Sequence, residues 1–288
     1  MFIAPMLPVA CPEPFDDERY IFEPKLDGRR LILSFHDRKA SLYNRYGHDV
    51  TRQYPELCRV PLAEPADVAL DGEAVYVNPE TGLMEPETVA ERFRLSRETR
   101  IREAALERPL HYFVFDIVYY NGRDLRGRPL LERKRLLAKL LAGNEHIHLL
   151  RHQDTFGMRA YAAARRLKLV GIMAKRKDSE YAPERSADWL TIPHYEYKDA
   201  VVYGYRKDGF GWLLEASGEP AGMLERAVDP GVRLAFEKEA RTMITGEDRS
   251  FVYLNPGIGI RIKFRGLTRD GLPRKPEFAA FTSSLPVY

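Results

Sequence analysis

Short extended segments with alternating side chains dominate the first part of the chain, and they restrict the possible folds more than any other feature. Four segments rich in β-branched and aromatic residues carry this pattern: residues 19–35, 39–47, 68–77 and 111–120. Turn signals such as Asp-Gly and Asn-Gly break or bound them, so we predict strands of a sheet. Helical periodicity covers 87–107, 130–142 and 157–169. Because these helices do not alternate regularly with strands, we expect an α+β fold built on a largely antiparallel sheet.

The character of the sequence changes after Trp189. Beyond residue 200 the chain consists of short strand-like segments and one helical stretch near 231–243, which is the pattern of a small β-barrel. The length of 288 residues suits two ordinary domains. We therefore predict one domain at 1–195 and a second at 196–288, although no linker rich in Pro, Gly or Ser separates them.

The composition indicates the cellular environment of the protein but says little about its binding partners. A formal charge of +3, from 45 Lys and Arg against 42 Asp and Glu, is too close to neutral to indicate a polyanionic partner. The two cysteines, Cys11 and Cys58, provide neither a disulfide framework nor a cysteine-rich zinc site. No segment has the features of a signal peptide or the roughly 18 apolar residues of a membrane span. We expect a cytoplasmic protein with no membrane partner.

Basic residues are nevertheless concentrated in two segments. Between Arg165 and Lys177 there are six basic residues and no acid, and between Arg261 and Lys275 there are six basic residues and one acid. Such clusters are typical of nucleic-acid binders, although either cluster alone could be an ordinary solvated face. Local charge therefore favours a nucleic-acid partner.

Common nucleotide-binding and metal motifs are absent. There is no P-loop, and Gly257-Ile258-Gly259 lacks the third glycine of a dinucleotide-binding turn because position 262 is Ile262. His146 and His148 do not form a His-Glu-x-x-His pair, so we interpret them as structural or surface residues.

One segment has the composition of a covalent catalyst. Lys25 stands between an expected strand end and an Asp27-Gly28 turn, and Arg29 and Arg30 follow. A lysine attacks as a nucleophile only in its neutral form, which desolvation or neighbouring positive charge favours. Arg30 or a bound metal could supply that charge. Taken alone, the segment could also be a charged hairpin turn.

Five elements in a fixed order resemble the motifs of the ATP-dependent DNA ligases of the covalent nucleotidyltransferase superfamily, above all the ligase module of bacterial end-joining enzymes. The elements are Lys25-x-Asp27-Gly28-x-Arg30, Asn44-Arg45-Tyr46-Gly47, Leu70-Asp71-Gly72-Glu73, Tyr112-Phe113-Val114-Phe115-Asp116 and Gly171-Ile172-Met173-Ala174-Lys175-Arg176. The likeness extends from about Pro5 to Phe281, and five ordered elements are far more specific than any one of them.

The resemblance implies a reaction and roles for the motif residues. Lys25 would be the catalytic nucleophile that attacks the α-phosphate of ATP, and the AMP would pass to the 5′-phosphate of a nick before the 3′-hydroxyl seals the strand. Phe115, rather than Phe113, would stack on adenine, and Glu73 would hold Mg²⁺ or Mn²⁺ or a ribose hydroxyl. The residues that would bind ATP are Glu23, Arg30, Arg45, Glu73, Phe115 and Lys175.

The second domain resembles the C-terminal OB-fold β-barrel of these ligases, which implies contacts to duplex DNA that do not read its sequence. The residues that would contact DNA phosphates are Arg261, Lys263, Arg265 and Arg274. We expect a monomer that acts on nicked duplex DNA, with end-joining or repair proteins acting in trans.

Three departures from the family pattern bear on the ATP-dependent step. Val170 replaces a metal-binding glutamate, Thr191 and Pro193 replace two phosphate-binding lysines, and residues 279–288 lack the usual Arg-x-Asp-Lys. Loss of one such donor typically costs about a hundredfold to a thousandfold in rate, although Lys177 or Lys198 could compensate. Two alternatives therefore stay open: a ligase-like protein that binds nicked DNA with impaired catalysis, and an RNA ligase.

Overall fold

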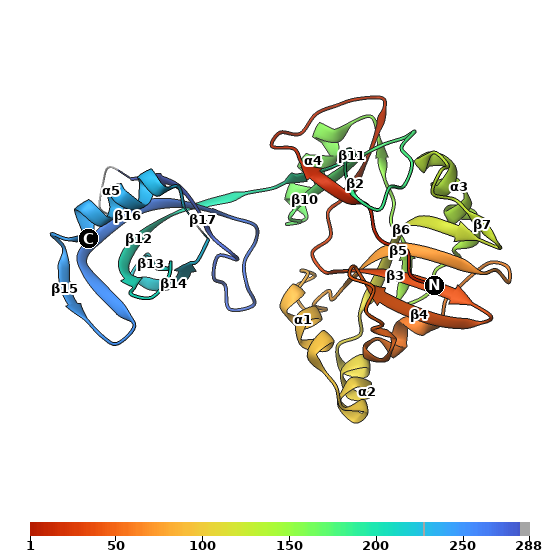
Figure 1. Ribbon diagram of the computed structural model, residues 1–288, viewed down its shortest axis with the longest axis horizontal. Coiled ribbons are helices and arrows are strands. Elements are labelled where there is room, and N and C mark those ends of the chain that lie inside the picture. Colours follow the sequence, from red (N-terminus) through yellow and green to blue (C-terminus); the bar gives the residue numbers. More distant parts are fainter. Residues whose placement is uncertain (227, 283–288) are drawn as a thin grey trace. The chain divides into compact units, whose positions relative to one another are not determined.

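Two sheets form the framework of the first unit, Met1–His194, in the computed structural model, which describes residues 1–226 and 228–282 (Figure 1). The first sheet has the order β1 (Leu7–Ala10), β11 (Arg185–Pro193), β10 (Gly171–Arg176), β2 (Tyr20–Pro24) and β9 (Gln153–Asp154). The second has the order β4 (Lys39–Asn44), β3 (Arg29–His36), β5 (Val68–Val75), β6 (His111–Tyr120) and β7 (Arg123–Asp124), with β8 (Ile147–Leu149) paired to β6.

Antiparallel pairing prevails in both sheets. Within the described residues of this unit, β1 with β11 and β6 with β8 are the parallel pairs. The predicted α+β class with largely antiparallel sheets is confirmed. Six strands of this unit lie outside the predicted strand segments: β1, β7, β8, β9, β10 and β11. All but β11 have six residues or fewer, and such short segments give little alternation from which to recognise a strand.

Helices occur where the periodicity predicted them, with one interruption. The stretch 87–107 forms two helices, α1 (Pro86–Arg94) and α2 (Glu98–Glu107), because Leu95 takes an extended conformation at the end of α1. Helix α3 (Leu130–Leu140) packs on β6, and α4 (Gly157–Arg166) packs on β2 and β10 (Figure 1). Two short 3₁₀ turns, Thr51–Gln53 and Pro55–Cys58, follow β4.

The second sheet is buried on both faces. Leu31, Ile32 and Leu33 of β3 are consecutive and have no exposed surface, as expected of a strand covered on two sides. Burying each such side chain contributes about 1.5–3 kcal/mol to folding. The hydroxyl of buried Tyr112 donates to the carbonyls of Leu31 at 2.9 Å and Leu70 at 3.1 Å, and thereby joins β6 to β3 and β5.

The second unit, Tyr195–Tyr288, contains one open sheet and one helix in its described residues. Its strand order is β14 (Glu219–Leu224), β13 (Trp212–Ala216), β12 (Glu196–Arg206), β16 (Phe251–Phe264) and β15 (Ile244–Glu247), with β17 (Glu277–Phe281) also paired to β16. Helix α5 (Pro230–Ala240) begins at Asp229, whose side chain accepts from the N–H of Gly231 at 2.8 Å, and Pro230 occupies its first turn.

The β-barrel predicted for this region does not close in the described residues, whose strands form an open sheet. Strands β15 and β17 both pair with β16, β17 along 260–263 and β15 along 252–254. Strand β12 pairs with the other edge of β16. In the described residues β14 pairs with β13 alone, so no strand pair closes the sheet into a barrel. Among the short strand-like segments expected beyond residue 200, those at 251–255 and 257–264 belong to one long strand, β16.

A membrane-spanning helix is not found in the described residues, since none combines sufficient length with sufficient apolar character. Part of the segment 279–288, in which we expected a family motif to be missing, lies outside the described residues.

Candidate active site

A cavity of about 500 Å³ in the first unit is lined by residues from both sheets. It contains every residue that the sequence predicted for catalysis or ATP binding: Glu23, Lys25, Arg30, Arg45, Glu73, Phe115 and Lys175. These residues come from β2, the turn after it, β3, the segment after β4, β5, β6 and β10. The structure therefore gathers the five separated sequence elements around one cavity.

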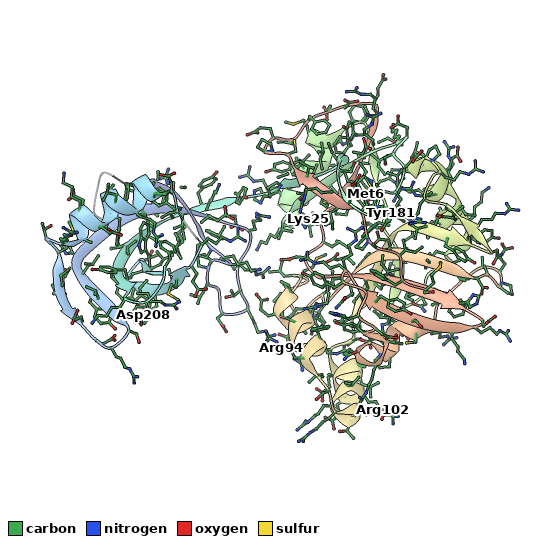
Figure 2. The ribbon with its side chains drawn as sticks, viewed as in Figure 1. Met6, Lys25, Arg94, Arg102, Tyr181 and Asp208 are labelled. Carbon is green, nitrogen blue, oxygen red and sulfur yellow. The ribbon has the colours of Figure 1, made fainter. Side chains whose placement is uncertain are left out.

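Lys25 is held in place by its backbone. It follows β2, and its N–H donates to the carbonyl of Gly171 at 3.0 Å, where β10 begins. The next turn requires glycine, since a Cβ on Gly28 would lie 2.1 Å from the carbonyl oxygen of Ala74 on β5. This close approach joins the two sheets and leaves the half-buried Lys25 side chain on the cavity wall. Figure 2 labels Lys25 in the first unit.

Glu73 is one of the two carboxylates that line the cavity, and the other is Glu23. It lies on β5, in register with Arg30 of β3 and Phe113 of β6. Burial raises the pKa of Glu73 to about 7, although the positive charges of Lys25 and Arg30 act in the opposite direction. Lys25 and Glu73 both line the cavity.

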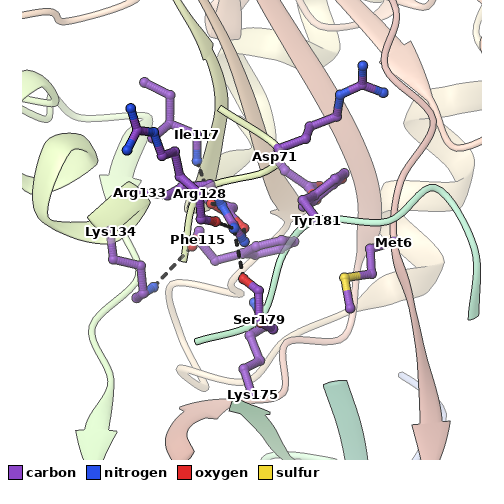
Figure 3. A network of polar contacts seen from close by, with 12 residues as sticks. Met6, Asp71, Phe115, Ile117, Arg128, Arg133, Lys134, Lys175, Ser179 and Tyr181 are labelled. Carbon is purple, nitrogen blue, oxygen red and sulfur yellow. Dashed lines mark hydrogen bonds and ion pairs between the residues drawn. The ribbon is translucent and has the colours of Figure 1, made fainter. Parts of the chain in front are cut away.

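Arg30 already has protein partners for its guanidinium. It donates through Nε and Nη2 to Asp71 at 2.9 and 2.5 Å, and through Nη1 to the carbonyl of Met6 at 2.6 Å. The fully buried Asp71 also accepts from the hydroxyl of Tyr181 at 2.6 Å (Figure 3). In this conformation the fork that we predicted for ATP phosphate binds Asp71 instead, so Arg30 connects β3, β5 and the N-terminal segment.

Glu23 is buried between two ammonium groups. Lys134 of α3 lies 2.5 Å from one carboxylate oxygen, and Lys175 of β10 lies 2.8 Å from the other. Burial alone would raise the pKa of Glu23, but Lys134 and Lys175 outweigh it and the pKa is lowered. Lys134 also donates to the carbonyl of Phe115 at 3.0 Å. This cluster therefore links β2, β10, α3 and β6 behind the cavity.

Lys134 was not predicted as a site residue. The sequence does contain a signal for it. Lys134 lies four residues after Leu130 and three before Leu137, so helical periodicity puts it on the same face as these two apolar residues. Both leucines are fully buried. Its neighbour Arg133 is also buried and donates to Asp116 at 2.9 and 2.8 Å and to the carbonyl of Ser179 at 3.0 Å (Figure 3). Helix α3 thus supports the cavity with two adjacent, inward-facing cations.

Lys175 lies between two aromatic rings. Its Nζ is 4.0 Å from the ring centre of Phe115 and 3.9 Å from that of Trp189, and the two rings are close to perpendicular. Burial lowers the pKa of Lys175, and Lys134 lowers it further, although Glu23 opposes both. Phe115 lines the cavity, whereas Phe113 contacts the ring of His148 with centroids 5.0 Å apart.

Arg45 is the exposed cation at the edge of this cavity. The buried side chain of Asn44 accepts from the N–H groups of Tyr46 at 2.9 Å and His48 at 3.1 Å, which shapes the turn after β4. The Arg45 guanidinium then lies 4.6 Å from the ring centre of Tyr46. Because it is exposed and has no carboxylate partner in the described residues, Arg45 is placed to contact an anionic ligand.

Two residues that depart from the family pattern, Thr191 and Pro193, lie on β11. Thr191 is paired with Met173 and Pro193 with Gly171, and the buried hydroxyl oxygen of Thr191 has no hydrogen-bond partner in the described structure. Neither proposed replacement lysine lines the cavity: Lys177 pairs with Asp154 at 3.0 Å, and Lys198 is exposed on β12. The cations of the cavity wall are Lys25, Arg29, Arg30, Arg45 and Lys175.

A cation bound in this cavity would depend on Glu73 and on the phosphates of a ligand. Glu23 is the other carboxylate of the wall and is engaged by two lysines, and Mg²⁺ in proteins is commonly held by one or two carboxylates plus substrate phosphates. In the described residues, the group of three possible metal ligands is His36, Asp37 and Asp67, which does not line the cavity.

The predicted DNA-binding residues lie in the second unit. Arg261, Lys263 and Arg265 alternate along β16 and just beyond it, and therefore share one face. Arg261 donates to Asp199 at 2.7 and 3.0 Å, while Lys263 and Arg265 lie about the ring of Tyr195, at 4.9 and 5.0 Å. Arg274 lies in the loop between β16 and β17 and donates to the carbonyl of Leu267.

Comparisons with known proteins agree with this arrangement. A family model, the ATP dependent DNA ligase domain, matches residues 5–192. The chain is 32% identical over 283 residues to the SPbeta prophage-derived DNA ligase-like protein LigB of Bacillus subtilis, across 98% of this chain and 99% of that protein. It is 32% identical over 214 residues to the multifunctional non-homologous end joining DNA repair protein LigD of Mycobacterium tuberculosis, across 71% of this chain and 26% of that protein.

Solved structures show the same fold. A mycobacterial DNA ligase D complexed with ATP and MES has a TM-score of 0.60 at 24% identity, over 97% of this chain and 94% of that chain. A Lig E DNA ligase has a TM-score of 0.65 at 17% identity, over 97% of this chain and 100% of that chain. The first unit is thus a mixed α+β nucleotidyltransferase domain like those of ligases. On its sequence and its relatives, the chain belongs to the ATP-dependent DNA ligase family.

Proposed function

We propose that this protein seals nicks in duplex DNA by carrying AMP on Lys25. The observation that carries the proposal is the single cavity that collects Lys25, Glu73, Phe115 and Lys175 from separate strands and turns. Transfer through a covalent lysyl-AMP is general for the family to which the chain belongs. The reaction splits one difficult strand-joining step into three substitutions at phosphorus.

In the first step, neutral Lys25 attacks the α-phosphate of ATP, a P–N bond forms and pyrophosphate leaves. The 5′-phosphate of the nick then displaces Lys25 from the AMP, and the 3′-hydroxyl displaces AMP to form the phosphodiester. Glu73 would hold a divalent cation together with the phosphates of ATP, and such a cation neutralises charge on the transferring phosphoryl group. Glu73 suits this because it is the wall carboxylate that no lysine ion pair occupies in the described residues.

Phe115 and Lys175 supply the nucleotide contacts in this proposal. Adenine stacks on the ring of Phe115, whose neighbour Trp189 also lines the cavity. Lys175 reaches the α-phosphate when its ion pair with Glu23 opens, and Lys134 then keeps Glu23 neutralised. A point charge at the α-phosphate stabilises the negative charge that develops during transfer.

The second unit supplies the contacts to DNA. We assign residues 1–195 to the adenylation domain and 196–288 to an OB-fold domain, since OB-folds are partly open five-stranded structures and tolerate the open ladder seen here. Arg261, Lys263, Arg265 and Arg274 contact phosphates of nicked duplex DNA. The end-joining function in the name of the LigD relative supports a repair role with proteins acting in trans.

Labelling with ATP tests the nucleophile. Incubation with α-labelled ATP and Mg²⁺ should label the protein, and Lys25→Ala should abolish the label. Lys177→Ala is the matched control, because Lys177 pairs with Asp154 and does not line the cavity. Label that persists on the Lys25→Ala protein would disprove the assignment of Lys25.

A second candidate function is a nick-binding protein that is impaired in the ATP step, and Thr191 and Pro193 favour it. Nicked DNA that already carries AMP on its 5′-phosphate separates the two cases. Sealing of this substrate without ATP, together with absent protein labelling, would show that only lysine adenylation is impaired. Binding without any sealing would support the non-catalytic function. The same assay on RNA nicks tests the RNA ligase alternative.

A further inference from the structure

A second cavity, of about 320 Å³, lies wholly within the second unit. It is formed by the segment 205–212, which connects β12 to β13, and by one side of α5. None of the four residues assigned to duplex contacts lines it. The cavity therefore needs an explanation separate from that of the basic face of β16.

Aromatic side chains form the floor of this second cavity. Trp212 and Phe236 are stacked with ring centres 4.2 Å apart and are 3% and 2% exposed, so they belong to the hydrophobic core. Phe210 lies 5.4 Å from Trp212 and is only partly buried. Because Trp212 and Phe236 are almost fully buried, the partly exposed ring of Phe210 is the part of this aromatic floor that a flat ligand can contact.

Cations surround this floor. Arg206, Lys207, Arg233 and Arg241 line the cavity, against the single acid Glu237. The guanidinium of Arg233 lies 4.7 Å from the ring centre of Phe210. Within residues 195–226 and 228–282, neither Arg233 nor Arg241 forms an ion pair, whereas Arg206 and Lys207 have acidic partners at 3.5 and 3.0 Å. Two arginines therefore remain available for an anion.

An aromatic floor with a cationic rim matches the two parts of a nucleotide, because a base stacks on aromatic rings and a phosphate binds arginine. Bases of intact duplex DNA are stacked on each other and cannot use the floor. We propose that the second cavity binds an unpaired nucleotide of single-stranded DNA, such as an overhang beside a break. This goes beyond nick sealing, and it requires no adenylation of Lys25.

Binding of tailed DNA to the full-length protein tests the proposal. Fluorescence anisotropy without ATP compares a labelled nicked duplex with the same duplex carrying a single-stranded tail of about ten nucleotides. We expect the tail to strengthen binding by about tenfold. Phe210→Leu, which keeps apolar volume but removes the ring, and the double variant Arg233→Gln with Arg241→Gln should each lose most of this gain.

Lys238→Gln is the matched control, because Lys238 is exposed on the same helix and does not line the cavity. It should keep the gain from the tail, and thermal unfolding should show that all variants are folded. The proposal is overturned if the tail gives wild-type protein no gain, or if the gain survives in both cavity variants. It is also overturned if the arginine variant weakens binding of the nicked duplex with and without the tail by the same factor, since the cavity would then contact only duplex phosphates.

Discussion

The two units use their cations in opposite ways. In the first unit, Arg30, Lys134 and Lys175 are buried or nearly so, and each is paired with a carboxylate. In the second, the cations at β16 are partly exposed and have partners that are also partly exposed, while Arg233 and Arg241 of the second cavity form no ion pair within the described residues of this unit. A buried ion pair holds two strands in register, but its cation is already neutralised and attracts a ligand only weakly. An exposed cation attracts an anionic ligand, and this attraction becomes weaker as the salt concentration rises. The difference predicts which substitutions affect folding and which affect DNA binding.

Breaking the buried cluster should have the largest effect on folding. Lys134→Met leaves Glu23 with one of its two partners and removes the donor to the carbonyl of Phe115. We expect the free energy of unfolding to fall by about 3–5 kcal/mol, as for other broken buried pairs. Urea denaturation measures this, with Lys139→Met on the exposed side of α3 as control. Equal stability of the two variants would show that the cluster does not support the fold.

Arg30→Lys should have a smaller but distinct effect. Lysine cannot reproduce the two-point contact with Asp71, so we expect a loss of about 1.5–3 kcal/mol in the free energy of unfolding. Denaturation and ATP labelling should be measured on the same variant. A protein of unchanged stability that no longer labels would contradict the structural role and restore Arg30 as a phosphate ligand.

Acid should weaken the buried cluster. The lysines lower the pKa of Glu23 in the folded protein despite burial, so its contribution to stability is present above the unfolded pKa of about 4.3 and is lost as pH falls further. The urea midpoint of wild-type protein should therefore drop between about pH 5 and pH 3. In Glu23→Gln this drop should be reduced, and identical pH profiles would contradict the prediction.

Neutralising the basic face of the second unit should leave stability unchanged. Lys263→Gln with Arg265→Gln removes two surface cations at the end of β16 and leaves the core residues beside them in place. DNA affinity should fall, and the slope of log affinity against log salt should decrease by about 0.9 for each DNA phosphate that the protein no longer neutralises. Titration of nicked DNA at several salt concentrations measures this. An unaltered slope would show that these residues do not bind phosphates.

Much of the site was predictable because its residues lie in short motifs in which the backbone or the chemistry allows few residue types. The Asp27-Gly28 turn is one example, since only glycine fits beside the backbone of β5. The choice of Phe115 over Phe113 rested on the family resemblance, and the structure places Phe115 on the cavity wall. Lys134 was missed because a helical pattern shows which face is buried but not which distant carboxylate a buried lysine meets.

The open sheet of the second unit was not predictable for a related reason. Alternation in residues 250–268 correctly indicated extended structure, but it does not show where one long strand is shared by several partners. Strand β16 pairs with β12, β15 and β17. In the described residues no strand pairs with the free edge of β14, so the sheet stays open. Pairing depends on register between segments far apart in the chain, which local composition does not encode.

The sequence by itself determined the α+β class, the ligase family and the motif residues that line the first cavity, because alternation, turn chemistry and ordered motifs are local properties. Tertiary structure alone decided how those residues are used. Arg30 meets Asp71 from 41 positions away, and Lys134 meets Glu23 from 111 positions away. The charge state and freedom of a side chain depend on such distant neighbours, since burial and ion pairing arise only when strands and helices pack.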